Sequence, residues 1–554
     1  MEYGHQVRLE TYYAVNRALG ETFIVYNPDF QKLEILKAET TMADGRKVAA
    51  PANAFNEVLP YAAHGFADFS GLREMVVTHT GLERGAVVDL RYRIHTKPGF
   101  FPGFAGREIL ARDFPVEAYS LTLIVPAGQE LRYRVFGPKI EAEVSANGAE
   151  KRYTFALADV PAAAHEPLAP VQAAAFVVFS SVADWGQALA LADDGSKLPA
   201  ALVEKIKKLR IQNPDRTDLL AALQKVAASE VQNCNLEPEM MGWHSRPLGR
   251  VAQSNYGTKL EKALLLQGML KEAGVFSQLL AVAAGTNFAE DVPSALQMGE
   301  YWLKASENGL PDAYLDPGHE QQEFFPYRSH GLAAFNMEKK ALENLPAQNW
   351  EQNRLEISGT VALEPAGASG TLMVNASGIF NRYMDAVEDN GKFIEGLLKK
   401  VFPIQKIEIT KLLMLTRHEI RVEATFNGPW LKDAGAGFFT VDHCRLPGLS
   451  ENMVQQTKRD APLLLDAPFK VILKLDLQPA ANLNLEYLAP EVLLSNEAGS
   501  FQRKQSRIKN GPIQFYTSCH FEKASLVPEL YPRLRELLQA YFTPGYWLVF
   551  KKGN

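Results

Sequence analysis

A single helical stretch near the middle of the chain constrains the fold more than any other feature. Residues 259–273 are mostly strong helix formers. Thr258 precedes them, where a hydroxyl can accept a hydrogen bond from a free backbone N–H, and Gly274 follows, where a helix ends. The apolar side chains cover most of the circumference: Leu264, Leu265, Leu266, Met269 and Leu270. We therefore expect a buried helix, followed by an inner strand over residues 275–282.

The start of this helix carries a short motif. It reads Gly257-Thr258-Lys259, then two residues, then Lys262-Ala263, and Tyr314-Leu315-Asp316-Pro317 follows further along the chain. Together these residues resemble the transglutaminase-like superfamily, whose fold is akin to that of papain. In active members the turn reads Gly-Asp-Cys, and the cysteine opens the helix, where the helix dipole favours a thiolate.

Two of the three catalytic positions of that family hold other residues here. Lys259 stands at the cysteine position, where a cation opposes the helix dipole and no neighbouring base is evident to activate it. The resemblance places a histidine at the start of the strand before the aspartate, yet residues 296–303 contain none. Asp316 alone remains, and an aspartate before a proline is also a common turn residue. We therefore expect that the chain has no catalytic residues and that Lys259 and Asp316 occupy degenerate catalytic positions.

Five residues are candidates for a retained ligand-binding cleft: Trp243, His244, Lys259, Asp316 and His319. Trp243 and His244 lie in the loop 234–255. In active members of the family that the chain resembles, the corresponding loop borders the cleft. The simpler alternative is that Trp243 only packs against the central helix, because large apolar residues are usually buried. His319 lies in a loop of Gly, Glu and Gln, where a histidine is more often solvated than catalytic.

Short strands flank the central unit on both sides. Evenly spaced strands with glycine and proline between them favour a β-sandwich before it, including a hairpin between residues 121–125 and 131–135. This part resembles the β domain of unknown function found ahead of many bacterial transglutaminase-like domains, through Tyr26-Asn27-Pro28 and the run from Leu82 to Val88. The last part resembles the β-rich domain that follows them.

The predicted fold class is multidomain α+β. We expect an N-terminal β-sandwich over residues 1–185, a central transglutaminase-like α+β domain over 186–346, and a C-terminal β-rich sandwich region with a few helices over 347–554. Alternatively, the C-terminal region divides into two subdomains, 347–455 and 456–554.

Composition excludes several function classes. A formal net charge of -6 over 554 residues gives no field that suggests nucleic-acid binding. No apolar run reaches the about 20 residues of a transmembrane helix. The three cysteines, Cys234, Cys444 and Cys519, are too widely spaced for a disulfide framework or a metal site. We expect neither a metal nor a cofactor.

The N-terminus, Met1 to Arg8, lacks the apolar core of a signal peptide. Proteins with the domain architecture that this chain resembles usually begin with a secretion signal. The resemblance therefore implies a periplasmic, cell-surface or secreted bacterial protein whose leader has been trimmed, while a cytoplasmic location stays open.

Three functions remain. The leading hypothesis is a non-catalytic transglutaminase-like extracytoplasmic protein that binds a peptide, a protein or a glycan. The second is a cysteine-type hydrolase or acyltransferase with a displaced nucleophile, Cys234, acting with His244 or His319. Cys234 does not lie at the helix N-terminus that would lower its pKa. The third is a structural assembly component. Neither the ligand nor the oligomeric state follows from the sequence.

Overall fold

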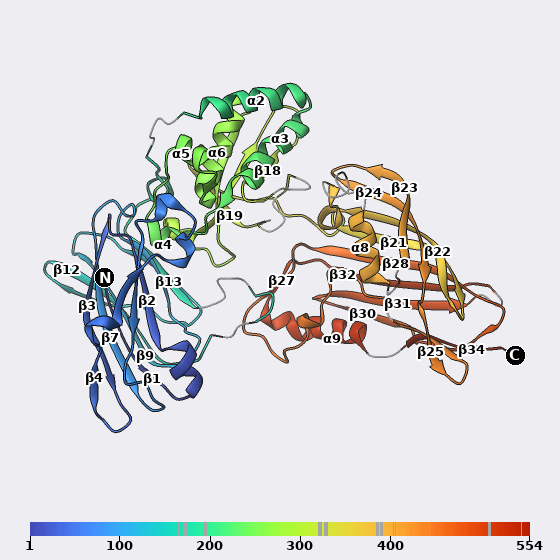
Figure 1. The fold of residues 1–554 in the computed structure, drawn as a ribbon, viewed down its shortest axis with the longest axis horizontal. Coiled ribbons are helices and arrows are strands. Elements are labelled where there is room, and N and C mark those ends of the chain that lie inside the picture. The colour runs from blue at the N-terminus through green and yellow to red at the C-terminus, as the bar shows by residue number, and fades with distance from the viewer. Residues whose placement is uncertain are drawn as a thin grey trace.

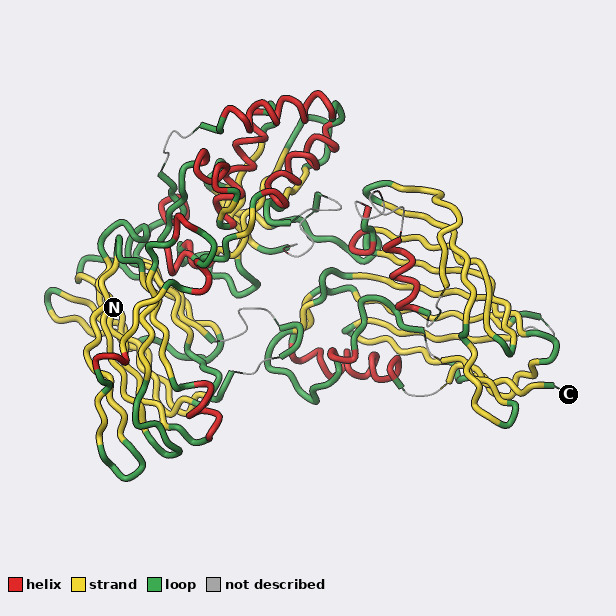
Figure 2. The backbone as a smooth tube through the Cα atoms, in the orientation of Figure 1, coloured by secondary structure: helices red, strands yellow, loops and turns green. Residues whose placement is uncertain are grey.

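The chain folds into a strand-rich, multidomain α+β molecule, as the sequence predicts (Figure 1). The computed structural model describes residues 1–163, 166–169, 175–192, 197–319, 324–325, 329, 331–383, 387, 392–402, 404, 406–442, 444–507, 511–543 and 546–553. Figure 2 shows strands at both ends of the molecule and most helices grouped in the central part. The central part contacts both of the others.

The N-terminal part consists of four small sheets. Its strands are β1 (Glu2–Arg8), β2 (Glu21–Tyr26), β3 (Gln31–Thr41), β4 (Lys47–Ala49), β5 (Phe55–Val58), β6 (Arg73–Thr78), β7 (Val87–Thr96), β8 (Ala105–Ile109), β9 (Val116–Pro126), β10 (Arg132–Phe136), β11 (Glu143–Asn147), β12 (Glu150–Val160) and β13 (Phe176–Ser180). The sheet orders are β1-β7-β3-β4, β2-β6-β5, β10-β13-β8 and β11-β12-β9. All pairings are antiparallel.

These sheets pack in pairs through apolar side chains. Ile24 and Val77 of one sheet meet Leu90 of another, while Phe155 and Val177 belong to a second shared cluster. The predicted hairpin across residues 126–128 is wrong. β9 pairs with β12 and β10 pairs with β13, so strands that are neighbours in the chain lie in different sheets.

The central part places helices against one antiparallel sheet. Its helices are α1 (Trp185–Ala188), α2 (Ala200–Gln212), α3 (Arg216–Lys225), α4 (Pro238–Met241), α5 (Leu248–Ser254) and α6 (Lys259–Glu272). Its strands are β14 (Gln232–Asn233), β15 (Tyr256–Gly257), β16 (Ser277–Ala283), β17 (Met298–Ala305), β18 (Ala313–Leu315), β19 (Ala333–Asn336) and β20 (Ala341–Asn344). The sheet order β18-β17-β16-β19-β20 makes β16 the central strand.

The helix expected from the sequence is α6, and it is buried. Leu266, Met269 and Leu270 are inaccessible to solvent and share one core with Leu279 of β16 and Leu303 of β17. Every residue of β16 is buried, including Ser277 and Gln278, which accounts for the apolar run from Leu279 to Ala283. The sheet and α6 therefore form a rigid base that positions the start of the helix.

The C-terminal part is built on one large sheet. Its elements are β21 (Arg354–Glu364), β22 (Gly367–Ser377), α8 (Lys392–Val401), β23 (Lys406–Leu415), β24 (Glu419–Gly428), β25 (Leu431–Gly435), β26 (Phe438–Asp442), β27 (Leu463–Leu464), β28 (Phe469–Pro479), β29 (Leu483–Leu488), β30 (Val492–Asn496), β31 (Gly499–Arg507), β32 (Ile513–Phe521), β33 (Ser525–Leu526), α9 (Tyr531–Phe542) and β34 (Tyr546–Lys552). The order of the large sheet is β23-β24-β22-β21-β28-β32-β31-β30.

Both halves of the C-terminal part contribute to this sheet. β21 and β28 pair in parallel at its centre, which joins residues before and after position 455. Ile394 of α8 and Leu537 of α9 belong to a single apolar core with strands from both halves. The stretches 347–455 and 456–554 therefore share one sheet and one core.

Within the described ranges, no helix is long and apolar enough to cross a bilayer.

Candidate functional site

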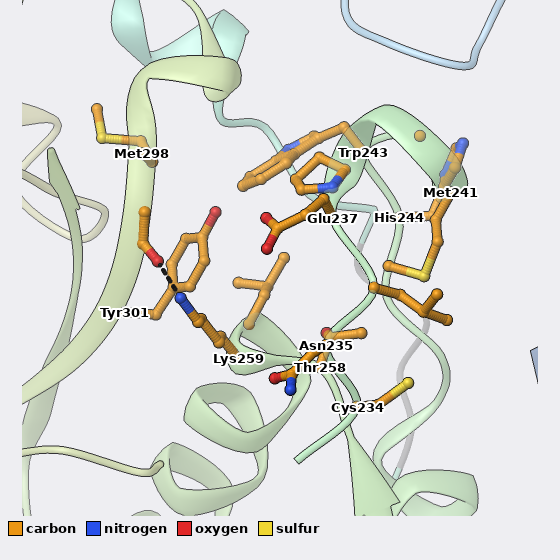
Figure 3. Close-up of a pocket in the computed structure, with 15 residues that line it drawn as sticks. Cys234, Asn235, Glu237, Met241, Trp243, His244, Thr258, Lys259, Met298 and Tyr301 are labelled. Atoms are coloured by element: carbon orange, nitrogen blue, oxygen red, sulfur yellow. Dashed lines mark hydrogen bonds between the residues drawn. The ribbon is translucent and has the colours of Figure 1, made fainter. Parts of the chain in front are cut away.

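The N-terminus of α6 is fixed by a capping box. The Thr258 hydroxyl accepts a hydrogen bond from the backbone N–H of Glu261 at 3.3 Å, and the Glu261 carboxylate accepts one from the backbone N–H of Thr258 at 3.0 Å. Two backbone donors of the first turn are thereby satisfied. Lys259 becomes the first helical residue, and its side chain extends toward β17 (Figure 3).

The Lys259 ammonium is held by that strand. Its Nζ donates to the backbone oxygen of Gly299 at 3.0 Å and to Oε1 of Glu300 at 2.8 Å. Each side chain of this ion pair is 43% exposed, so its net stabilisation is modest. Its structural effect is to fasten the first turn of α6 to the start of β17.

The pocket around Lys259 is small. Its cavity volume is about 40 Å³, room for a few water molecules. Cys234, Glu237, His244 and Tyr301 line it together with Lys259 (Figure 3). Because ligand pockets commonly enclose about 300–1,000 Å³, a peptide or sugar does not fit here in this conformation.

Trp243 and His244 reach this pocket in different ways. Trp243 is buried in the central core, and its indole N–H donates to the backbone oxygen of Ala190 at 3.1 Å. His244 is exposed and stacks on Phe30 of the N-terminal part, with ring centroids 4.9 Å apart. The two residues therefore help to join parts of the molecule as well as lining the pocket.

Asp316 and His319 lie elsewhere, after β18, and do not line the pocket at Lys259. Oδ1 of Asp316 accepts a hydrogen bond from the backbone N–H of Gly318 at 2.7 Å, and Oδ2 lies 3.1 Å from Nδ1 of His319. The backbone oxygen of Asp316 accepts from Gln224 at 3.0 Å. Asp316 thus stabilises the turn that follows β18. The five candidate residues form two groups, with three at the pocket and two at this turn.

Lys262 is the most deeply buried charged residue of α6. Its side chain is inaccessible to solvent, and its Nζ donates to Val231 O at 2.6 Å, Asn233 Oδ1 at 2.8 Å and Ala228 O at 3.3 Å. Burial lowers the pKa of Lys262 to about 8, against an opposing effect of the Asp316 charge. From the sequence alone, this buried site could have been noticed because Lys262 stands within a largely apolar helix.

Arg246 was not singled out from the sequence, yet it joins two parts of the molecule. Its guanidinium donates from Nε and Nη2 to the two carboxylate oxygens of Glu261, at 2.9 and 2.8 Å. Its Nη1 donates to Asp68, in the short 3-10 turn Ala67–Phe69 of the N-terminal part, at 2.5 Å. The guanidinium also lies 4.6 Å from the ring centroid of Tyr256. The capping carboxylate of α6 is therefore also an anchor for the N-terminal part.

Cys234 lines the pocket but is a poor nucleophile. Its side chain is buried, and desolvation, reinforced by the negative charge of Glu261, raises the pKa of the thiol to about 12. Burial also raises the pKa values of Cys444 and Cys519. All three cysteines are free thiols.

In the part of the chain that the structure describes, no three His, Cys, Asp or Glu side chains cluster in a way that could hold a metal ion.

The chain is similar to two families at its two ends. Residues 2–164 match DUF3857, a domain of unknown function with solved structures, and residues 439–543 match DUF3858, a second domain of that kind. These segments lie on either side of the residues that form the pocket.

The whole chain also matches a solved structure, that of a candidate protease from Parabacteroides distasonis ATCC 8503. The TM-score is 0.72 with 24% sequence identity, over 99% of this chain and 95% of that chain. This likeness shows that the fold is shared along the full length. The periplasmic domain of TgpA from Pseudomonas aeruginosa matches with a TM-score of 0.18 and 12% identity, over 38% of this chain and 72% of that chain. No curated protein matches the chain.

Proposed function

We propose that this chain is a non-catalytic, transglutaminase-like extracytoplasmic bacterial protein that binds a peptide, a protein or a glycan. The contact between Lys259 and Glu300 carries the proposal. By the sequence resemblance, Lys259 occupies the cysteine position at the start of α6. Glu300 lies on β17, the strand to which the resemblance assigns the histidine. An ammonium and a carboxylate therefore face each other where a thiol and an imidazole would be required.

This pair does not supply the chemistry of a cysteine enzyme. Nucleophilic catalysis needs an attacking group that loses its proton to a nearby base. The Lys259 ammonium instead donates hydrogen bonds to Glu300 and to the Gly299 carbonyl, so it is held by these acceptors and presents no lone pair for attack. Asp316 is engaged in its own turn and does not line this pocket.

The displaced-nucleophile alternative has weaker support. Cys234 is 2% exposed, and the raised pKa of its thiol leaves very little thiolate near neutral pH. His319 contacts Asp316 rather than the pocket that Cys234 lines. His244 lines the same pocket as Cys234, so a hydrolase based on Cys234 would chiefly need a lower thiol pKa.

The location and the domain limits belong to the same proposal. Architectures of this type usually carry a secretion signal, and the two matched families lie where the resemblance expects flanking β domains. We place the domains at residues 1–185, 186–346 and 347–554.

The test is an activity assay on the intact chain. Peptide hydrolysis and acyl transfer to an amine are followed by mass spectrometry, with generic peptide and glutamine-containing substrates. The proposal expects no turnover above a heat-denatured sample. Turnover that disappears in Cys234→Ala, or in Lys259→Ala, would overturn it. Gln267→Ala, a change on the same helix outside the pocket, is the matched control.

A further inference from the structure

A larger cleft lies between the central part and the C-terminal sheet. Its volume is about 790 Å³, within the range of ligand-binding clefts. It is bounded by the start of α3, the loop before β18, the linker 348–352, and the ends of β21, β22 and β24 that face the central part. Figure 1 shows α3 and β18 on one side of this region and β24 on the other. None of the five candidate residues from the sequence lines it.

Most charged side chains of the cleft form ion pairs within the protein. Arg216 pairs with Glu307 at 2.9 Å, Arg354 with Glu356 at 2.7 Å, Arg417 with Asp218 at 3.7 Å, Asp312 with Lys304 at 3.2 Å, and Glu419 with Arg421 at 2.9 Å. An ionic ligand would have to compete with these existing partners, at a cost in desolvation. Hydroxyl groups can add to the same guanidinium and carboxylate groups, because each retains further donors or lone pairs.

Apolar surfaces lie beside these polar groups. Leu310 is 48% exposed at the rim, next to Pro311. Phe324 lines the cleft, and the Arg417 guanidinium lies 5.4 Å from its ring centroid. In addition, the side-chain oxygen of Gln348 is buried at the cleft and accepts no hydrogen bond from any described residue. Because this oxygen is inaccessible to solvent, the Gln348 side chain would have to turn before a ligand hydroxyl could donate to it.

We propose that this cleft binds a neutral oligosaccharide. Sugar rings present apolar faces to Leu310, Pro311 and Phe324, and their hydroxyls suit the paired charged groups and Gln348. The inference rests on the proposed binding function and names its site and ligand class. The proposed binding site is therefore this cleft and not the small pocket at Lys259.

The strand arrangement favours a glycan over a peptide. Extended peptides commonly bind by adding a strand to an unpaired sheet edge. The strands of the large sheet whose ends border the cleft, β21, β22 and β24, are interior strands of that sheet. Their backbone groups already pair with neighbours on both sides. β18, which also borders the cleft at Ala313, is an edge strand of the central sheet, but its Tyr314 N–H already donates to the backbone oxygen of Phe324 at 3.0 Å. A peptide strand added at the cleft would therefore find few of the main-chain partners that usually hold it.

The experiment uses the intact chain and two probe sets. The first is a glycan array with calorimetric follow-up, using neutral oligosaccharides of glucose, mannose, xylose and N-acetylglucosamine. The second is a set of uncharged peptides of matched length. Thr217→Trp fills the cleft from the half-buried second residue of α3, and His418→Ala trims its exposed rim. Ile211→Trp is the control, because this side chain is 80% exposed on α2 outside the cleft.

The expected result is saturable binding of at least one neutral oligosaccharide. We expect Thr217→Trp to weaken it at least about tenfold and Ile211→Trp to leave it unchanged. No binding across the array, binding that Thr217→Trp leaves intact, or cleft-dependent binding of peptides alone would each overturn the inference. Cleavage of a bound oligosaccharide would instead overturn the non-catalytic function while the cleft assignment stands.

Discussion

Glu300 holds the ammonium of Lys259 at 2.8 Å, and this contact joins the first turn of α6 to the start of β17. The turn is already fixed by the Thr258 capping box, so a helix N-terminus faces a strand at this contact. A cysteine enzyme would need a thiol and an imidazole at two such facing positions. Substitutions at positions 259 and 300 can test whether these two side chains face each other.

Lys259→Cys combined with Glu300→His should create a reactive thiol. A cysteine at this helix N-terminus, next to an imidazolium, has a lowered pKa, whereas Lys259→Cys alone faces a carboxylate that raises it. We expect iodoacetamide to alkylate the double variant about tenfold faster than the single variant at about pH 7. Glu300→His alone is the control for the native thiols. Equal rates would show that position 300 does not face the helix start in solution.

The native cysteines should react slowly. Cys234, Cys444 and Cys519 are buried, and burial raises the pKa of each thiol. We expect intact-mass measurements to show little alkylation of the folded protein near neutral pH and modification of all three thiols in denaturant. Rapid modification of Cys234 alone in the native protein would favour the displaced-nucleophile alternative.

The predictable parts of this molecule are those that local sequence determines. The Thr258 cap, the apolar stretch of α6 and the buried strand β16 depend on neighbouring residues, and all three were expected. The false hairpin over residues 121–135 shows the limit. Its turn residues are suitable, but pairing of β9 with β12 and of β10 with β13 depends on sheet packing that one sequence does not reveal.

The site was harder to predict for the same reason. Arg246 contacts Asp68, a residue 178 positions away, and nothing near Arg246 signals that partner. The cleft between the central and C-terminal parts gathers several distant segments, so no single motif marks it. The sequence motif identified the start of α6 but grouped Asp316 and His319 with a pocket that they do not line.

Arg246→Met should destabilise the protein strongly. Glu261 is 2% exposed, and losing both hydrogen bonds from the guanidinium leaves a buried carboxylate without its cation. The expected loss is about 3–5 kcal/mol. Arg250→Met is the matched control, since Arg250 is 50% exposed and its carboxylate partner is Asp68, so a much smaller loss is expected. Calorimetric unfolding compares them, and equal losses would contradict a special role for Arg246.

The contact of Asp68 with the two arginines should weaken in acid. Hydrogen bonds from Arg250 and Arg246 lower the pKa of Asp68 to about 2. Because the folded pKa lies below the unfolded value of about 3.9, the stabilisation is complete above that pH and is lost as the pH falls toward about 2. We expect a loss of about 1 kcal/mol after allowance for solvent screening.

Asp68→Asn provides the comparison for this acid effect. The variant cannot titrate at position 68, so its stability should fall less steeply below about pH 4. The measurement is the difference in unfolding free energy between the two proteins across this window. A difference that stays constant with pH would contradict the assigned pKa.

Lys262 should make the folded protein more stable at alkaline pH. Burial lowers the pKa of Lys262 to about 8, whereas the unfolded chain keeps a value of about 10.4. Between these values the unfolded state binds more protons, so the free energy of unfolding rises with pH. The neutral amine still donates two hydrogen bonds to its three acceptors, Val231, Asn233 and Ala228. The expected gain from about pH 7 to about pH 9.5 is on the order of 1–2 kcal/mol.

Lys262→Met isolates this contribution because methionine has no proton to lose. Other groups titrate equally in both proteins, so the difference between them in unfolding free energy carries the effect of Lys262 alone. Lys259→Met is the matched control, since Lys259 lies on the same helix with a side chain that is 43% exposed. We expect the wild type to gain stability relative to Lys262→Met as the pH rises, and this gain to exceed any gain relative to Lys259→Met over the same interval. Parallel pH profiles for wild type and Lys262→Met would mean that Lys262 remains charged in its buried site.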